Sequence, residues 1–446
     1  MNPIIIDRSQ HIVSRKNISA EALKVLYRLR EAGFLACLAG GGVRDLLLGR
    51  RPKDFDIATD AHPNQVKRLF RNCRLIGRRF RLAHVFFPHT IIEVSTFRAS
   101  APPAAAPGDA SPPAAAGHHV KSADGVIMRD NVFGTPPEDA LRRDFTINAL
   151  FYNIADFSIV DYVGGLQDLD ARRLRVIGDP RVRFLEDPVR MIRAVRFSAM
   201  LDFTIEETAR QAILEMKDSL ALASKERMYE EMRKVIFCGE AERALKALMD
   251  MGLFSVLFPD AGAWYTGETP AAEAGRARLF KALRQVDIWK KAGLQPGDPL
   301  LWALLFAAYH EARAAEASGG RLLAAALARA AHEHLLNQAN RVQIPRNVVR
   351  GTTDILAVQP AFLRTAGKSS QRLAGRPVFR DAYVYFKLGA RARGGQDELI
   401  RWWDQLARGP AARPGREPDE ISPRPTTMAE AGGSVADSPK SGDSTG

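Results

Sequence analysis

The chain has 446 residues, of which 46% are hydrophobic, and its formal net charge is +13. This length accommodates two or three domains, and the positive excess favours a polyanionic partner, either nucleic acid or a membrane surface. The three cysteines form no CxxC pair, which argues against a zinc or redox motif, and the apolar runs in 1–10 and 299–310 are too short for a signal peptide or a membrane span. We therefore expect a cytoplasmic protein without a membrane partner.

The N-terminal part alternates between helical and strand patterns. A helix is predicted over 19–33, because Ser19 can cap its N-terminus and Gly33 can end it. Residues 34–49, FLACLAGGGVRDLLLG, indicate a strand, a glycine turn and a short helix. The predicted elements that follow are a strand at 54–59, a helix at 63–70 and a strand at 91–97. Such alternation is typical of an α/β domain.

The rest of the chain reads as mostly helical, with two segments of biased composition. Residues 99–123 are rich in Ala, Pro, Gly and Ser, which indicates a disordered insertion. Residues 408–446 are polar and rich in Pro, Ser and Gly, which indicates a disordered tail. Residues 138–154, EDALRRDFTINALFYNI, read as a helix, and helical patterns dominate from about 180 onward.

Basic and apolar residues are interleaved in the stretch 75–87, LIGRRFRLAHVFF. As a strand it would have no purely apolar face, since Arg79 and Arg81 fall on one side and Arg78 and Phe80 on the other. The stretch lies between two predicted strands of the α/β domain. We therefore expect its arginines to contact phosphate.

The glycine turn in LAGGGVRD, 38–45, could also bind phosphate. Backbone amides of Gly40 and Gly41 at the start of a helix can approach an anion closely, and Arg44 would add a positive charge. By themselves, glycines at a strand–helix turn are more often only turn chemistry, and Arg44 could be a surface arginine.

Carboxylates occur in two of the predicted strands. Asp54 and Asp56 lie two residues apart, so both would face the same side of one strand, with Phe55 and Ile57 in the core behind them. Such a pair suits Mg²⁺, and a pair of ions can clamp the attacking and leaving oxygens of a phosphoryl transfer. The alternative is turn or cap material on a strand edge.

Glu93 interrupts an otherwise apolar predicted strand, IIEVSTF. Burying a carboxylate without a partner is costly. If this strand pairs with the strand that carries Asp54, Glu93 becomes a third carboxylate on the metal side. The alternative is a solvent-facing position on an edge strand.

The motif LRRDFTINAL, 141–150, contributes a polar pair. Asp144 and Asn148 are four residues apart, so on a helix they would share one face and could hold sugar hydroxyls. Arg142 and Arg143 could meet phosphate, although a solvated helix face is the alternative.

A second pair lies in EDPVRMIRAVRF, 186–197. Asp187 before Pro188 is a typical N-cap signature, and from Arg190 onward arginines follow one face at i+3 spacing. The acceptor of Asp187 and the donor of Arg190 match the Watson–Crick edge of adenine and equally that of cytosine. This pair would reject guanine and uracil but could not by itself separate adenine from cytosine.

In their order, the motifs GGGVRD, DFD, RRDFTIN, EDPVR and ERMYEE resemble those of class II nucleotidyltransferases. These are the bacterial poly(A) polymerases and CCA-adding enzymes of the polymerase-β-like superfamily. The resemblance implies an α/β nucleotidyltransferase head domain over 16–175, followed by an all-α half. That half would comprise a neck for base selection and RNA binding over 176–262 and a body over 263–407. The stretch GRRFRLAH, 77–84, resembles the poly(A) polymerase branch more than the CCA-adding branch.

The resemblance also implies residue roles. Asp54 and Asp56 would ligate two Mg²⁺ ions, with Glu93 as a further catalytic carboxylate. The residues that would bind the ATP substrate are Gly40, Gly41, Arg44, Arg143, Asp144, Asn148, Asp187 and Arg190, with the last two as an amino-acid template for the base. Arg78, Arg79 and Arg81 would meet the triphosphate or the RNA end. Glu226, Arg227 and Glu231 would brace the template residues, although a helix-surface ion pair is their alternative.

The implied activity is addition of AMP from ATP to RNA 3′ ends without a template, with release of pyrophosphate. One Mg²⁺ would lower the pKa of the RNA 3′-hydroxyl and the other would steady the pyrophosphate. Proteins of RNA decay are implied as partners. The alternatives are a tRNA enzyme that adds CCA or A, and an RNA-binding protein without catalysis on the same fold. His332 and His334 do not share a helical face and are interpreted as surface residues rather than metal ligands.

Overall fold

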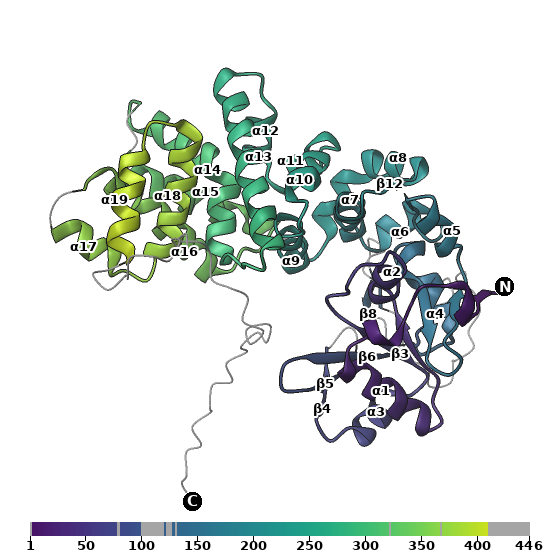
Figure 1. Ribbon diagram of the computed structural model, residues 1–446. Coiled ribbons are helices and arrows are strands. Elements are labelled where there is room, and N and C mark those ends of the chain that lie inside the picture. The colour runs from purple at the N-terminus through teal and green to yellow at the C-terminus, as the bar shows by residue number, and fades with distance from the viewer. Residues whose placement is uncertain are drawn as a thin grey trace, which may run out of the picture.

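The computed structural model describes residues 2–77, 81–99, 120–121, 127–129, 132–320, 323–365 and 368–408. Figure 1 shows an elongated molecule with a sheet and its helices at one end. From α7 (Val189–Leu201) onward, helices extend away from the sheet toward the other end. Within the described ranges, no helix is long and apolar enough to cross a membrane.

The described residues contain an eight-stranded sheet with the order β1-β10-β9-β2-β3-β6-β5-β4. Its strands are β1 Ile4–Ile6, β2 Ala36–Ala39, β3 Asp56–Thr59, β4 Cys73–Ile76, β5 Leu82–Phe86, β6 Ile91–Thr96, β9 Leu150–Asn153 and β10 Ile159–Asp161. Neighbouring strands are antiparallel except β3 and β6, which run parallel with Ile57 opposite Val94. Two short pairs join β7 Val120–Lys121 to β8 Ile127–Arg129, and β11 Arg173–Leu174 to β12 Thr204–Ile205.

Three helices share a core with one face of this sheet. They are α1 Ala20–Glu31, α2 Gly41–Leu47 and α3 Pro63–Leu69. Their buried residues, such as Leu26, Val43 and Val66, pack with Ile57 and Val94 of the sheet. The opposite face carries a smaller cluster that includes residues of β2, β3, β9 and α4 (Pro136–Arg142). Because side chains alternate along a strand, Asp56 and Glu93 stand on this second face.

Local signals in this part of the chain are confirmed with one change. The Ser19 hydroxyl accepts a hydrogen bond from the Ala22 amide at the start of α1, and Gly33, with φ +85°, follows the helix. The strand predicted at 54–59 begins only at Asp56. Its ladder with β2 ends at the pair of Ala39 and Asp56, beyond which β2 turns into the glycine loop. Asp54 therefore lies in the loop before β3 and not on the strand.

The helix predicted over 138–154 is wrong beyond residue 142. After α4 the chain is extended at Arg143, forms one 3-10 turn at Thr146–Asn148 and enters β9. The Thr146 amide donates to the Arg175 carbonyl, and β9 pairs with both β2 and β10. These tertiary pairings stabilise the extended conformation more than the weak local helix propensity favours a helix.

The rest of the described chain is helical around one continuous apolar core. Its α-helices are α5 Gly165–Asp170, α6 Pro180–Glu186, α7, α8 Glu207–Met216, α9 Lys225–Ile236, α10 Ala241–Asp250, α11 Leu253–Leu257, α12 Pro259–Thr266, α13 Pro270–Lys291, α14 Asp298–Ala317, α15 Ala324–Asn337, α16 Arg346–Ala357, α17 Lys368–Ala374, α18 Phe379–Arg393 and α19 Asp397–Arg408. Phe145 and Ile147 belong to the same core, so the segment after α4 joins the sheet to the helices. The division into head, neck and body at the predicted boundaries stays a prediction.

Three further expectations concern the later part of the chain and the insertion. His334 is buried and not a surface residue, because α15 packs against α14 and α16, whereas His332 is exposed as expected. His334 Nδ1 lies 3.0 Å from His310 Nε2. Of the predicted insertion 99–123, the structure describes only residue 99 and β7, and the predicted tail beyond residue 408 lies outside the described residues.

Candidate active site

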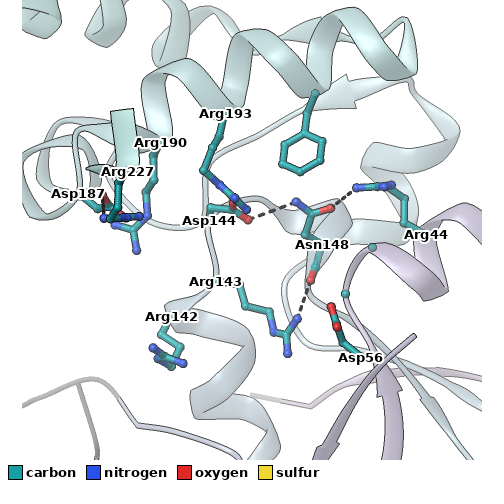
Figure 2. Close-up of a pocket in the computed structure, with 13 residues that line it drawn as sticks. Arg44, Asp56, Arg142, Arg143, Asp144, Asn148, Asp187, Arg190, Arg193 and Arg227 are labelled. Atoms are coloured by element: carbon teal, nitrogen blue, oxygen red, sulfur yellow. Dashed lines mark hydrogen bonds and ion pairs between the residues drawn. The ribbon is translucent and has the colours of Figure 1, made fainter. Parts of the chain in front are cut away.

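A cavity of about 420 Å³ lies where the turn after β2, the segment after α4 and the start of α7 meet (Figure 2). This volume is typical of small-molecule sites. The cavity is lined by Gly40, Gly41, Arg44, Asp56, Arg142, Arg143, Asp144, Asn148, Asp187, Arg190, Arg193, Phe197 and Arg227. Its six arginines outnumber its three aspartates, so the lining favours an anionic ligand.

The glycine turn forms one wall of the cavity, and two of its glycines lie close to neighbouring groups. Gly40 has φ +71°, a left-handed conformation, and a Cβ there would lie 2.9 Å from NH1 of Arg143. A Cβ on Gly42 would lie 3.3 Å from the backbone oxygen of Asp54. The absence of side chains thus lets α2 approach the loop that carries Asp54.

Arg44 is buried and is not the surface arginine of the alternative interpretation. Its NH1 donates to Asn148 Oδ1 at 2.6 Å, and its Nε and NH2 donate to Asp45 Oδ1 at 2.9 and 2.7 Å. The guanidinium carbon also lies 5.2 Å from the centroid of the Phe197 ring. Arg44 is therefore held in one orientation at the edge of the cavity.

Asp144 and Asn148 meet as expected, although a tight turn and not a helical face brings them together. Asn148 Nδ2 donates to Asp144 Oδ1 at 3.2 Å, and Arg193 donates through Nε and NH2 to Asp144 Oδ2 at 2.8 and 2.6 Å. Burial alone would raise the pKa of Asp144, but the charge and hydrogen bonds of Arg193, together with Asn148, lower it to about 2. Arg143 donates to the Asn148 carbonyl at 3.1 Å (Figure 2).

The predicted catalytic carboxylates lie near one another. Since Ile57 pairs with Val94, the preceding residues Asp56 and Glu93 are neighbours on one face of the sheet. Asp56 is exposed by surface area, but its carboxyl is closely surrounded, and this burial raises its pKa to about 6 with further contributions from Glu93 and Asp54. Burial and Asp54 likewise raise the pKa of Glu93. The three carboxylates therefore repel one another in the absence of a cation.

These carboxylates have the right chemistry for Mg²⁺, which prefers oxygen ligands and offsets negative charge. Within the described residues, however, no group of three His, Cys, Asp or Glu side chains is arranged to hold a metal ion together. Asp56 lines the cavity, whereas Asp54 and Glu93 do not. The donor set fits the predicted ion, and the metal role stays a prediction.

The two template residues line the cavity at the end opposite Asp56 (Figure 2). Asp187 is not the N-cap of α7, because Pro188 occupies that position. Instead, Asp187 ends α6 and accepts hydrogen bonds from NH1 and NH2 of Arg227 at 2.7 and 2.8 Å. Arg190 donates through NH1 to the Arg183 carbonyl at 2.8 Å.

The three expected brace residues reach different places. Arg227 contacts the template residue Asp187, as described above. Glu226 accepts a hydrogen bond from Ser224 at the start of α9. Glu231 lies 3.2 Å from Arg196, 3.5 Å from Arg193 and 2.9 Å from Lys234. Arg227 thus contacts the template residue Asp187, whereas Glu231 pairs with Arg193 and Arg196 of α7.

The arginine stretch 78–81 is only partly described, since Arg78 and Arg79 lie outside the described residues. Arg81 is exposed in the loop before β5, and its carbonyl accepts a hydrogen bond from Arg98 at 3.4 Å. The flanking residues form the antiparallel strands β4 and β5 and not one strand. Arg81 does not line the cavity, and its role stays a prediction.

The cavity is also lined by Arg142 and by two residues without a predicted role, Arg193 and Phe197. For α7 a signal was present, because Arg193 and Phe197 follow Arg190 by one and two helical turns. Arg142 was named with Arg143 as a residue that could meet phosphate.

Comparisons with known proteins identify relatives of this chain. Residues 36–175 match the model of the poly A polymerase head domain. Residues 202–264 match one described as "Probable RNA and SrmB- binding site of polymerase A", and 320–427 match the polymerase A arginine-rich C-terminus. Poly(A) polymerase I of Escherichia coli O6:H1 is 39% identical over 418 residues, which cover 90% of this chain and 85% of that protein. The chain belongs to the poly(A) polymerase family.

Membership of this family makes the chain a nucleotidyltransferase of the polynucleotide adenylyltransferase class. CCA-adding enzymes are further relatives. That of Bacillus pumilus is 37% identical over 237 residues, which cover 53% of this chain and 54% of that protein. A solved structure of the Bacillus stearothermophilus CCA-adding enzyme in complex with CTP has a TM-score of 0.59 at 27% identity and covers 87% of this chain and 81% of that one. The predicted fold class, an α/β nucleotidyltransferase domain followed by helices, is confirmed.

Proposed function

We propose that this protein adds AMP from ATP to the 3′ ends of RNA without a nucleic-acid template and releases pyrophosphate. One observation carries the proposal. A single arginine-rich cavity joins the glycine turn and Asp56 at one end to Asp187 and Arg190 at the other. A nucleoside triphosphate has the matching polarity, with phosphates at one end and a base at the other.

The phosphates and ribose would occupy the end near the glycine turn. Amides of Gly40 and Gly41 lie at the start of α2, and Arg44 and Arg143 line the same end. Asp144 is kept ionised by Arg193, so its carboxylate can accept hydrogen bonds from ribose hydroxyls beside the Asn148 amide. Because these groups are fixed by their own hydrogen bonds, they would orient the nucleotide without reorganising.

The base would lie at the far end against Asp187 and Arg190. Adenine offers an amino donor beside a ring-nitrogen acceptor, which the Asp187 carboxylate and the Arg190 guanidinium can pair. Arg227 donates to both oxygens of the Asp187 carboxylate, which fixes the plane of that carboxylate.

Asp54 and Asp56, with Glu93 beside them, would hold Mg²⁺. Mg²⁺ held by these residues would lower the pKa of the attacking RNA 3′-hydroxyl and would neutralise charge on the leaving pyrophosphate. The side chains of this protein then contribute position and charge: the arginines hold the phosphates in place, and the template residues hold the base.

RNA is the proposed acceptor and partner. The match of residues 202–264 to a region described as a probable RNA-binding site supports it, as does the net charge of +13. Partners in RNA decay and a cytoplasmic location follow from the family resemblance and the composition and belong to the proposal.

The test supplies purified protein with Mg²⁺, an unstructured RNA and either ATP or CTP. We expect long adenylate tails with ATP, much slower extension with CTP, and a loss of AMP incorporation of about a thousandfold or more in Asp54→Asn and Asp56→Asn, as is typical for removal of a metal ligand or catalytic group. Asp170→Asn, at an exposed position on α5, is the matched control and should retain activity. Full AMP incorporation by Asp54→Asn would show that the metal site is misplaced, whereas no AMP incorporation by the wild-type protein would favour the non-catalytic RNA-binding alternative.

A tRNA enzyme that adds CCA or a terminal A is the second candidate. The likeness to the CCA-adding enzyme structure favours it, and so does the template pair, which accepts adenine and cytosine alike. A tRNA lacking its CCA end, offered with CTP, distinguishes the two activities. Incorporation of CTP as efficient as that of ATP would replace the proposed function with this one.

A further inference from the structure

Arg183 touches both ends of the candidate site without lining the cavity. From α6, its NH2 donates to the backbone carbonyls of Arg142 and Arg143 at 2.5 and 2.6 Å. These carbonyls lie where α4 ends and the chain becomes extended. The side chain of Arg143 continues from there to the Asn148 carbonyl, at the ribose and phosphate end of the cavity.

The same residue also holds the template arginine. The backbone carbonyl of Arg183 accepts the hydrogen bond from NH1 of Arg190 at 2.8 Å. Both arginines share one carboxylate oxygen of Glu186, at 2.9 Å from Arg183 NH1 and 3.5 Å from Arg190 NH1. Through one residue, therefore, the template end and the phosphate end are fixed relative to each other.

Stability alone does not require an arginine at this position. Its side chain is only 12% exposed, and in the described part of the chain its buried Nε has no hydrogen-bond partner. Burial is the main reason that the pKa of Arg183 falls to about 10. A buried cation with an unpaired N–H costs stability, and a packed apolar residue is often at least as stable. What an apolar residue could not supply is the bridge between two segments.

We propose that Arg183 is a positioning residue that sets the distance between the template and the phosphate-binding end, and thereby favours ATP over CTP. The proposal rests on the proposed function of this cavity. Adenine and cytosine present the same order of donor and acceptor, so the template pair alone does not separate them. They differ in reach, because the Watson–Crick edge of a purine lies farther from the sugar than that of a pyrimidine. A fixed spacing between the two ends converts this difference in reach into selectivity.

The test compares the full chain with Arg183→Gln and Arg183→Lys. Each protein extends one unstructured RNA by a single nucleotide, with ATP and with CTP, and KM and kcat are measured for both. The readout is the ratio of kcat/KM for ATP to that for CTP, which does not depend on the fraction of folded protein. We expect this ratio to fall by about tenfold to a hundredfold in both variants, as is typical of a misplacement of about 1 Å. We expect KM for ATP to rise more than kcat falls.

Arg181→Gln is the matched control. Arg181 lies on the same helix and also pairs with a glutamate, Glu215, but its side chain is 54% exposed. The ratio of kcat/KM for ATP to that for CTP in Arg181→Gln should equal that of the wild type. A second probe, Glu186→Gln, weakens the shared contact and should give a smaller fall in the ratio. An unchanged ratio in Arg183→Gln and Glu186→Gln, with wild-type protein selective for ATP, would overturn the inference alone. Wild-type protein that uses CTP as readily as ATP would instead overturn the proposed function.

Discussion

Arg227 and Asp187 form a two-point ion pair, with NH1 to Oδ1 at 2.7 Å and NH2 to Oδ2 at 2.8 Å. The pair joins α9 to the junction of α6 and α7, although the two residues are 40 positions apart in the chain. Parallel bonds of this kind fix the plane of a carboxylate as well as its location. The direction in which Asp187 faces the cavity therefore depends on α9.

Arg227→Lys should weaken nucleotide selection without removing the chemistry. Lysine keeps the charge but cannot form the two parallel hydrogen bonds, so Asp187 would lose its fixed plane. We expect kcat/KM for ATP to fall by about tenfold to a hundredfold, mainly through KM, which corresponds to the loss of a charge-assisted hydrogen bond. Steady-state kinetics check this, with Glu226→Gln as control on the same helix. Equal losses in both variants would contradict a specific role for Arg227.

Asp144→Asn should lower stability and change its dependence on acid. The pKa of Asp144 is about 2 in the folded chain, below the value of about 3.9 of an unfolded aspartate. Its contribution to stability is thus present above about pH 4 and is lost as the pH falls through about 2. Because the variant also leaves the partly buried Arg193 with only its longer contact to Glu231, we expect a loss of about 2–3 kcal/mol at neutral pH.

Urea unfolding at pH 7 and pH 3 measures this effect. The difference between wild type and Asp144→Asn should be smaller at pH 3, where the wild type has begun to lose the contribution. The exposed Asp170→Asn serves as control and should change neither value by more than about 0.5 kcal/mol. A difference that grows on acidification would refute the assignment.

The buried pair His310 and His334 should make the helical half sensitive to mild acid. Burial lowers the pKa of His334 to about 4 and that of His310 well below its ordinary value. Phe306 and Tyr309 pack against the pair, and Gln338 bonds the His334 backbone, so no acidic side chain among these contacts offsets a charge. Between about pH 6.5 and 4, the unfolded histidines bind protons that the folded ones do not. The free energy of unfolding should therefore decrease as the pH is lowered through this window. The decrease should be up to about 1.4 kcal/mol per pH unit for each histidine.

Replacing both residues, His310→Leu with His334→Leu, should remove this slope. His332→Gln, on the same helix but exposed, should retain it. Thermal unfolding midpoints at pH 4.5, 5.5 and 6.5 give the comparison. A wild-type midpoint that does not change over this range would argue against neutral buried histidines.

RNA binding should be strongly salt-dependent and largely independent of sequence. An excess of 13 positive charges favours contacts with phosphates, which release counterions. We expect the logarithm of the affinity to fall linearly with the logarithm of salt concentration, with a slope of about −0.7 per contacted phosphate. Fluorescence anisotropy with two unrelated RNAs measures it, and Asp54→Asn, which alters the proposed metal site, should show the same slope. Equal affinity at low and high salt would contradict the prediction.

Much of the sheet could be predicted because its signals are local. Ser19 and Gly33 bound α1, and the alternation of apolar residues predicts β3 and β6. Pairing of β3 with β6 was stated only as a condition, since a single sequence does not reveal which strands are neighbours. Asp54 shows the limit: it shares the strand pattern with Asp56 but has no ladder partner beyond Ala39.

Site residues that belong to a sequence motif could be predicted. Contacts that depend on a segment far away in the sequence were harder to predict. Asp144 and Asn148 were paired on the premise of a helix, and the structure brings them together through a turn anchored by Arg175. Arg227 was expected to brace the template residues, but its two hydrogen bonds to Asp187 were not predicted. No role was predicted for Arg183, because it donates to backbone carbonyls. Every residue has a backbone carbonyl, so the sequence carries no signal for such a contact.

Gly42 lies outside the cavity lining, on the side of α2 toward the Asp54 loop. A methyl group there would sit 3.3 Å from the Asp54 oxygen, so the loop would have to yield by a few tenths of an ångström. Every side chain with chemistry would still be present after such a change. The space beside Gly42 thus partly determines which mutations this site tolerates. A substitution there can be harmful although every functional side chain is still present.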